Sequence, residues 1–363
     1  MPATALNTWE PAPAPPGLRE ARFYEPLAES RVRCVACAHR CVVFSEQMGI
    51  CGVRANKEGK LYTLVYGKAV AAHVDPIEKK PFYHFLPGTR SFSIATAGCN
   101  MHCRFCQNWQ ISQVRSRDSE LGFALAPEQA VEAATRYGCE SLAYTYTEPT
   151  VFIEYALDTA RDAKRRGLKN VFVTNGYYTE EALEEMLPLI DAANIDLKSF
   201  RDGTYRKVCG ATLKPVLDSI SRSFQRGMWI EVTTLVIPGL NDSDAELRDI
   251  AQFLAGLSRD LPWHISRFLP AYRMTDRGPT PVTTLNHARD IGRQAGLHHV
   301  YVGNVEGERE DTTCPHCGEI LLVRSSLRLL ANYLRDGACP RCRRPLAGVG
   351  LAPKVEPDSV ATA

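Results

Sequence analysis

The chain has 363 residues, with 43 Lys and Arg against 41 Asp and Glu, so it offers no strongly basic surface for nucleic acid or an anionic membrane. Apolar residues make up 45% and charged residues 23%, as in an ordinary soluble globular protein. No apolar run is long enough to span a bilayer, and the N-terminus lacks the basic and apolar segments of a secretory signal. We therefore expect a cytoplasmic protein without a membrane or nucleic-acid partner.

Thirteen cysteines are the first unusual feature of the composition. Disulfides are not expected without an export signal, because the cytosol keeps thiols reduced. Cysteines that only fill space would be scattered, whereas eleven of these fall into three groups at metal-ligand spacings. The groups are Cys34, Cys37, Cys41 and Cys51; Cys99, Cys103 and Cys106; and Cys314, Cys317, Cys339 and Cys342. The sequence therefore predicts three metal sites.

The cysteine groups and the composition divide the chain into five parts. Both ends are rich in Pro, Ala or small polar residues, which is typical of disorder. We predict a disordered lead (1–24), a Cys-rich segment (25–85), an α/β barrel (86–308), a zinc-ribbon-like or rubredoxin-like module (309–350) and a disordered tail (351–363).

The first cysteine group has the spacing Cys-x2-Cys-x3-Cys-x9-Cys over residues 34–51. Four thiols suit either a structural zinc ion or an auxiliary iron–sulfur cluster. The close triple differs from the paired knuckles of a common zinc ribbon. Zinc is favoured here, because nothing in the sequence indicates a second redox group.

Short β-rich runs alternate with helical stretches through the middle of the chain. Strands are predicted at 91–97, 141–147, 170–174, 193–198, 229–237 and 263–269, and helices at 127–138, 149–167, 180–192 and 241–257. Pro127 suits the first position of its helix, and Asn241 is predicted as the N-cap of the last.

Repeated strand–helix units imply parallel strands joined by right-handed crossovers. Six units favour a partial (β/α)6 barrel over a complete eight-fold barrel, and a doubly wound sheet is the alternative. Polar residues follow successive strands, at the end where barrels place their chemistry. We therefore predict a TIM-like partial barrel.

The central motif, Cys99-x3-Cys103-x2-Cys106, follows directly after the first predicted barrel strand. Thiolates are the soft ligands of iron–sulfur clusters, and a closed [4Fe–4S] cluster needs four of them. Three ligands on one loop leave the fourth iron open to another molecule. A zinc site completed by His102 is the alternative, although adjacent loop positions make His102 a poor geometric partner.

This motif resembles the signature of radical S-adenosylmethionine (SAM) enzymes, with Phe105 as its aromatic residue next to the cofactor. The resemblance implies that the open iron chelates the amino and carboxylate groups of SAM. It further implies an oxidoreductase that cleaves SAM to methionine and a 5′-deoxyadenosyl radical, which takes hydrogen from an unidentified protein or small molecule. A ferredoxin or flavodoxin is then the expected electron donor.

The later strand ends fit the same resemblance. Glu148 in Thr-Glu-Pro is similar to the acid that holds the SAM ammonium group. Thr174 and Asn175 resemble the element near the SAM ribose, and Asp196 with Lys198 resembles the Asp-Leu-Lys element of glycyl-radical-enzyme activases. Two further matches are the adenine-side element at 237–239 and Tyr272 at the sixth strand end.

The last cysteine group forms two Cys-x2-Cys pairs separated by 21 residues, which is typical of a zinc ribbon. A rubredoxin-like iron site has the same sequence pattern, and zinc is favoured. Two cysteines remain outside the groups. Cys139 is predicted to be a core thiol, and Cys209 follows the fourth strand end as either a buried structural thiol or a functional one near the barrel mouth.

The order of all three cysteine groups around the core resembles the AmmeMemoRadiSam-system radical SAM enzymes, which are related to pyruvate formate-lyase activating enzyme. That resemblance covers roughly residues 25–350 and implies association with Memo-type and AMMECR-type proteins. Two alternatives stay open: a true glycyl-radical enzyme activase, and a non-catalytic, zinc-rich scaffold or nucleic-acid-binding protein. The near-neutral charge argues against the last.

Overall fold

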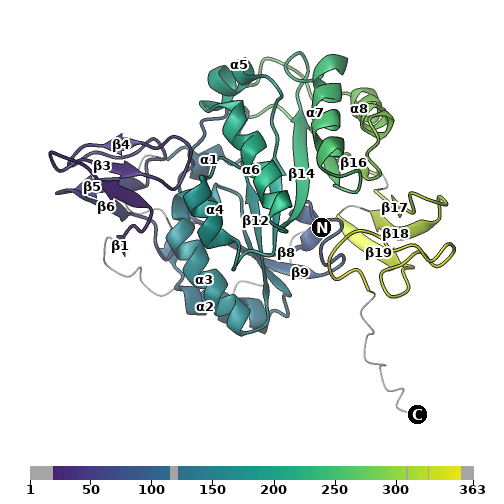
Figure 1. Ribbon diagram of the computed structural model, residues 1–363, viewed down its shortest axis with the longest axis horizontal. Helices are drawn as coiled ribbons and strands as arrows, with labels where there is room; N and C mark the ends of the chain where they lie inside the picture. Colours follow the sequence, from purple (N-terminus) through teal and green to yellow (C-terminus); the bar gives the residue numbers. More distant parts are fainter. Residues whose placement is uncertain (1–18, 115–121, 308–309, 326, 353–363) are drawn as a thin grey trace, which may run out of the picture.

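The computed structural model describes residues 19–114, 122–307, 310–325 and 327–352 (Figure 1). Its centre is an eight-stranded sheet with the order β16-β15-β14-β13-β12-β11-β9-β8. The strands are β8 (Ala71–Pro76), β9 (Arg90–Ala95), β11 (Ser141–Tyr144), β12 (Lys169–Thr174), β13 (Ala192–Asp196), β14 (Trp229–Val236), β15 (Trp263–Arg267) and β16 (Val300–Gly303). Those from β9 to β16 run parallel, and β8 pairs antiparallel with β9.

Each parallel strand pairs with the next one along the chain, so every crossover turns in the same direction. A doubly wound sheet reverses its strand order at a switch point, and this sheet does not. The six predicted strands are confirmed. The sequence analysis missed β8 and β16, which form the two edges. Because β8 joins this sheet, the predicted barrel boundary at residue 86 is wrong.

Helices cover the parallel strands along one face, as expected when strands are buried on both sides. They are α2 (Pro127–Arg136), α3 (Ile153–Arg165), α4 (Glu180–Met186), α6 (Leu213–Gln225), α7 (Asp244–Leu257) and α8 (Val282–Gln294). The short helices α1 (Trp109–Ser112) and α5 (Asp202–Thr204) belong to the segments that follow β9 and β13. The π-turn η3 (Tyr205–Cys209) follows α5. No helix in the described ranges has the length and apolarity that a bilayer crossing requires.

The first residues of α2 and α7 agree with the predicted helix starts in one case and differ in the other. Pro127 lies in the first turn of α2, as predicted. Asn241 is not the N-cap of α7. That role belongs to Ser243, whose hydroxyl accepts a hydrogen bond from the Glu246 amide. Asn241 instead accepts from the Ile237 amide at 2.7 Å, and so fixes the loop after β14.

An N-terminal module lies at one end of the long axis in Figure 1. It contains β1 (Arg19–Glu20), β2 (Tyr24–Pro26), β3 (Val32–Cys34), β4 (Val42–Val43), β5 (Arg54–Lys57) and β6 (Lys60–Thr63). The predicted disordered lead was set too long. β1 already pairs with β6, and Ala21 and Phe23 are buried in the core. Residues 1–18 lie outside the described residues.

The C-terminal module lies at the opposite end and contains β17 (Thr312–Thr313), β18 (Ile320–Ser325) and β19 (Arg328–Asn332). It is attached to the segment between β8 and β9 by the fully buried Arg324, which donates to the Tyr83 carbonyl at 2.6 Å. The predicted tail began at 351, yet Leu351 is buried in this module. The rest of the tail, 353–363, lies outside the described residues.

Candidate active site

The cysteine loop follows β9 and begins at Gly98, whose φ of 95° lies in the region that favours glycine. An added Cβ at Gly98 would lie 2.6 Å from a Val53 methyl and 3.0 Å from the Cys51 carbonyl oxygen. The N-terminal module therefore packs directly against this loop. The close approach explains why the sequence has glycine immediately before Cys99.

The loop is fixed from its other side by η3. The His102 amide donates to the Cys209 carbonyl at 2.8 Å, and the Arg104 amide donates to Val208 at 3.0 Å. Cys103 is buried, and a hydrogen bond from the Cys209 thiol lowers the pKa of Cys103. The structure therefore places Cys209 against the cysteine loop, fully buried.

Three thiols of one loop, Cys99, Cys103 and Cys106, thus lie at the carboxyl end of the parallel strands. The Cys106 thiol also contacts the Ser112 hydroxyl at 3.2 Å. His102 does not complete a zinc site with them. Its side chain is exposed, and its Nδ1 is hydrogen-bonded to Gln113 at 2.9 Å. Soft ligands from one short loop suit an iron–sulfur cluster.

Glu148 follows β11 and is 1% exposed. Its carboxylate accepts hydrogen bonds from the Thr150 amide and hydroxyl, the Thr174 hydroxyl and the Asn175 amide, at 2.6–3.0 Å. Burial raises the pKa of Glu148, and these hydrogen bonds oppose that shift. Glu148 thereby holds the ends of β11 and β12 in one arrangement.

Asn175 connects β12 to the cysteine loop. Its amide nitrogen donates to Asn100 Oδ1 at 2.7 Å and lies 3.9 Å from the Cys99 sulfur. Its own Oδ1 accepts from the Tyr177 amide. Asn175 therefore lies beside Cys99 of the cysteine loop.

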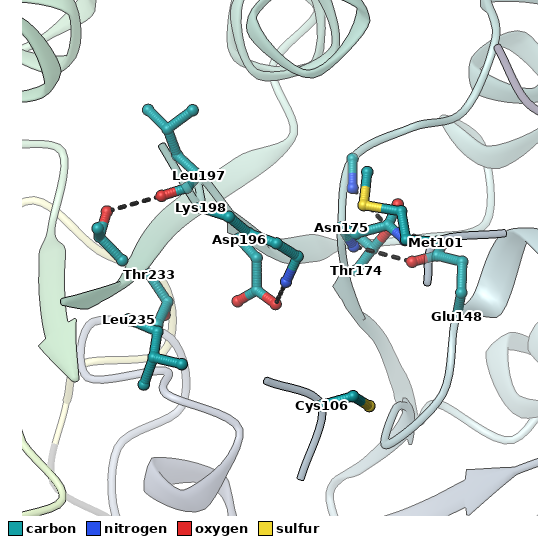
Figure 2. A network of polar contacts seen from close by, with 12 residues as sticks. Met101, Cys106, Glu148, Thr174, Asn175, Asp196, Leu197, Lys198, Thr233 and Leu235 are labelled. Atoms are coloured by element: carbon teal, nitrogen blue, oxygen red, sulfur yellow. Dashed lines mark hydrogen bonds and ion pairs between the residues drawn. The ribbon is translucent and has the colours of Figure 1, made fainter. Parts of the chain in front are cut away.

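Asp196 and Lys198 form an ion pair at the end of β13, with Nζ 2.7 Å from Oδ2. Burial alone would lower the pKa of Lys198, but Asp196 and Cys103 raise it well above its usual range. Figure 2 shows this pair, the Glu148 group and Cys106 at the same end of the strands. A fixed cation and anion beside the thiols suit a zwitterionic ligand.

The remaining predicted residues lie around this centre. Phe105 is buried in the core below the loop. Tyr272, after β15, has a φ of 52° and stacks on Trp109, with ring centroids 5.3 Å apart. The sequence analysis did not single out Trp109. It also missed Asn100, which is fully buried beside Cys99 and could have been recognised as a polar residue inside the cysteine motif.

The C-terminal cysteines are arranged differently. In the described part of the chain, only Cys314, Cys317, Cys339 and Cys342 bring three or more ligand atoms within 4.8 Å of one another, as one ion requires. Two sulfur pairs lie 3.6 Å apart. Tetrahedral zinc with sulfur at 2.3 Å would place its ligands about 3.8 Å apart. The spacing therefore suits a single ion.

Comparison with known proteins agrees with the geometry. Residues 93–254 match the model of the radical SAM superfamily. An uncharacterized protein of Methanocaldococcus jannaschii is 46% identical over 310 residues, covering 85% of this chain and 92% of that protein. The isethionate sulfite-lyase activating enzyme of Oleidesulfovibrio alaskensis is 30% identical over 122 residues, 32% of this chain and 40% of that enzyme.

A solved domain of a pyruvate-formate lyase-activating enzyme from Bacteroides vulgatus is 22% identical and covers 45% of this chain and 99% of that domain, with a TM-score of 0.39. The matched region of the superfamily model begins within β9 and ends within α7, and so contains the cysteine loop, Glu148, Asn175 and Lys198. The radical SAM match and the activating enzymes among the relatives support an enzyme over the non-catalytic scaffold considered above. The chain belongs to the radical SAM superfamily and is related to the glycyl-radical enzyme activating enzymes.

Proposed function

We propose that Cys99, Cys103 and Cys106 hold a [4Fe–4S] cluster whose open iron binds SAM, and that the chain abstracts hydrogen from a substrate. When bound, the cluster supplies the electron that cleaves SAM to methionine and a 5′-deoxyadenosyl radical. The observation that carries the proposal is the junction of three loop thiols with the Asp196–Lys198 pair at one end of the parallel strands. Barrel enzymes place their chemistry at that end.

The residues around the cysteine loop then have separate roles in binding and positioning SAM. Lys198 faces the SAM carboxylate and Asp196 the ammonium group, because each is the opposite charge. Glu148 is a positioning residue, since its hydrogen bonds keep Thr174 and Asn175 on the ribose side. Any ammonium contact of Glu148 stays a prediction. Tyr272, stacked on Trp109, supplies an aromatic surface for the adenosine end.

Formation of 5′-deoxyadenosine tests the proposal. Protein reconstituted anaerobically with iron and sulfide, reduced with dithionite and given SAM should release methionine and 5′-deoxyadenosine in equal amounts. The matched control is the same protein carried through reconstitution without iron, which should release neither. An iron-loaded protein that binds no SAM in equilibrium dialysis, and forms no product, would refute the proposal.

A glycyl-radical activase is the second candidate, supported by the activating enzymes among the relatives. In that case the hydrogen donor is a glycine Cα–H of a partner polypeptide. A deuterium label at C5′ of SAM does not report where the transferred hydrogen comes from. The informative label is therefore α-deuterated glycine in the partner polypeptide. Deuterium transfer into 5′-deoxyadenosine, with a new organic radical signal, identifies an activase.

Within the superfamily, the order of the three cysteine groups supports placement among the AmmeMemoRadiSam-system enzymes. Memo-type and AMMECR-type proteins are then candidate partners, and a ferredoxin or flavodoxin is the candidate electron donor. Co-purification of the anaerobic complex with each partner tests the first pair. Reduction of the SAM-bound protein by each donor tests the second.

The C-terminal module is proposed to be a zinc ribbon. Purified chain should contain about one zinc that a mercurial reagent releases, and Cys314→Ser should lose it, because one ligand of four is missing. Without zinc, we expect trypsin to cleave within residues 310–352 at least about tenfold faster, since ion binding stabilises such modules. Cys139→Ala is the matched thiol control. Iron with a rubredoxin-like absorption spectrum in place of zinc would contradict the assignment.

A further inference from the structure

The N-terminal cysteines surround one space, although they belong to separate turns of the module. Cys34, Cys37, Cys41 and Cys51 all line one pocket of the N-terminal module. Cys34 is buried, and the other three are half-buried. Four thiols that face one cavity, with no disulfide among them, form a metal site rather than four separate core residues.

The spacing of these thiols differs from that of the C-terminal cysteines, which are proposed to form a zinc ribbon. The C-terminal sulfurs lie close enough together for one ion. The N-terminal four, like the cysteines of the loop after β9, are not gathered within that distance in the described structure. In a [4Fe–4S] cluster each thiolate binds a different iron, so its four ligands stand farther apart than the ligands of one ion. The N-terminal thiols therefore lack the single-ion arrangement that the C-terminal thiols have in the described structure.

Two buried donors at the cavity have no partner among the described residues. Arg54 Nη1 and Asn100 Nδ2 are both without a hydrogen bond, and their residues are 2% and 0% exposed. Both residues line the cavity. Unpaired buried donors are costly, so an acceptor is expected there. A cluster offers its inorganic sulfides in addition to the thiolates, and hydrogen bonds to those sulfurs are a usual feature of such sites.

The cavity also adjoins the SAM site. Asn100 lines it and is the neighbour of Cys99 in the chain. The His39 ring lines it too, and its Nε2 is 2.7 Å from the Asn100 carbonyl oxygen, so His39 is engaged there rather than free at the surface. On the other side, the Cys51 carbonyl meets Gly98. One residue on either side of Cys99 therefore separates the two sites.

We propose that Cys34, Cys37, Cys41 and Cys51 bind a second [4Fe–4S] cluster, which delivers electrons to the cluster at Cys99, Cys103 and Cys106. The proposal rests on the function proposed above and replaces the zinc that the sequence analysis favoured. One electron from a donor of the ferredoxin or flavodoxin class enters at the N-terminal site and passes by the Asn100 segment to the SAM site. Each SAM cleaved consumes one such electron: methionine leaves with a neutral thioether sulfur, and C5′ keeps the unpaired electron.

Metal analysis of the full chain after anaerobic reconstitution tests the site itself. Wild type should hold about eight iron, eight sulfide and one zinc per chain. Cys37→Ala/Cys51→Ala and Cys99→Ala/Cys103→Ala/Cys106→Ala should each keep about four iron and four sulfide. About one zinc in each variant reports that the chain is still folded, and Cys139→Ala is the thiol control.

The triple variant decides the matter, because it retains the N-terminal site intact. Four iron with a reducible cluster signal that SAM does not alter supports the proposal. Two zinc and no iron in this variant overturns it. This outcome is distinct from failure of the proposed function, which would show as wild type that holds cluster but neither binds SAM nor forms 5′-deoxyadenosine.

Electron transfer from the N-terminal cluster to the SAM-site cluster, here called the relay, is tested by the yield of 5′-deoxyadenosine per reduced chain. Protein is reduced, freed of reductant by gel filtration, and given SAM without further donor. Wild type should approach two 5′-deoxyadenosine per chain, and Cys37→Ala/Cys51→Ala should approach one, because each reduced cluster stores about one electron. Equal yields from the two proteins would overturn the relay.

Discussion

Replacement of Cys103 by alanine is expected to abolish SAM cleavage. Cys103 is the middle ligand of the loop, and two remaining thiols cannot hold a cluster with one open iron. Loss of partners that only orient a metal ligand already costs about 10–100-fold, so removal of a ligand should lower 5′-deoxyadenosine formation by more than about 100-fold. The measurement is product per chain in a fixed anaerobic incubation, with iron content determined on the same sample.

Cys209→Ala is the sharpest control for that result. Cys209 is also a fully buried thiol, and it is hydrogen-bonded to Cys103 itself. Its place in the sequence, outside the Cys99–Cys103–Cys106 motif, puts it outside the proposed ligand set. We therefore expect Cys209→Ala to keep its iron and its SAM cleavage within about tenfold of wild type, as a change outside the ligand set. A fall to about four iron per chain in Cys209→Ala, with about eight retained in Cys103→Ala, would show that the ligand set is wrong.

Arg54→Met is expected to cost the largest share of folding stability among the substitutions considered. Arg54 and Glu154 form an ion pair with side chains 3% and 2% exposed, and the pair ties the N-terminal module to α3. Removing one partner leaves a buried carboxylate without its cation, which costs about 3–5 kcal/mol. For a chain of this size, that should lower the midpoint of thermal unfolding by about 4–7 °C.

The double variant Arg54→Met/Glu154→Leu should recover most of this loss, because it leaves no unpaired charge. Lys214→Met provides a surface comparison: it breaks an ion pair whose lysine side chain is 81% exposed, and should change stability by less than about 1 kcal/mol. Calorimetry at one scan rate, with metal content matched, gives the midpoints. A shift below about 2 °C for Arg54→Met would contradict the assigned role of the pair.

The pH dependence of the same pair has a definite sign. Burial alone would raise the pKa of Glu154, but Arg54 lowers it below its usual value. The stabilising contribution of Glu154 is therefore present above the usual carboxyl range and is lost as pH falls through the folded pKa. In Arg54→Met, protonation of Glu154 removes the unpaired buried charge and with it most of the destabilisation. The difference in midpoint between wild type and Arg54→Met should accordingly shrink on acidification.

Local sequence was sufficient for the features that depend on spacing along the chain. The six internal strands, the helices α2, α3, α4 and α7, and the three cysteine groups follow from hydrophobic runs and ligand intervals, since each is encoded within a few residues. The helix α6 between β13 and β14 was not predicted. Pro127 at the start of α2 is one such feature. The family resemblance also came from the cysteine motif and the order of polar strand ends.

Tertiary structure decided what depends on residues far apart in sequence. Asn241 was predicted as an N-cap, but its side chain accepts a hydrogen bond from the Ile237 amide and donates one to the Lys198 carbonyl. The edge strand β8 was missed because a short strand is recognised only by its pairing with β9.

The metal sites show the same division. Spacing along the chain predicts a metal site at each cysteine group, because ligand type and interval are local properties. It did not distinguish one ion from a cluster at residues 34–51, since the separation of four sulfurs is set by how the turns fold in space. Packing also brought Gly98 against Cys51 and Asn100 into the N-terminal cavity, so only the folded chain places that site beside Cys99.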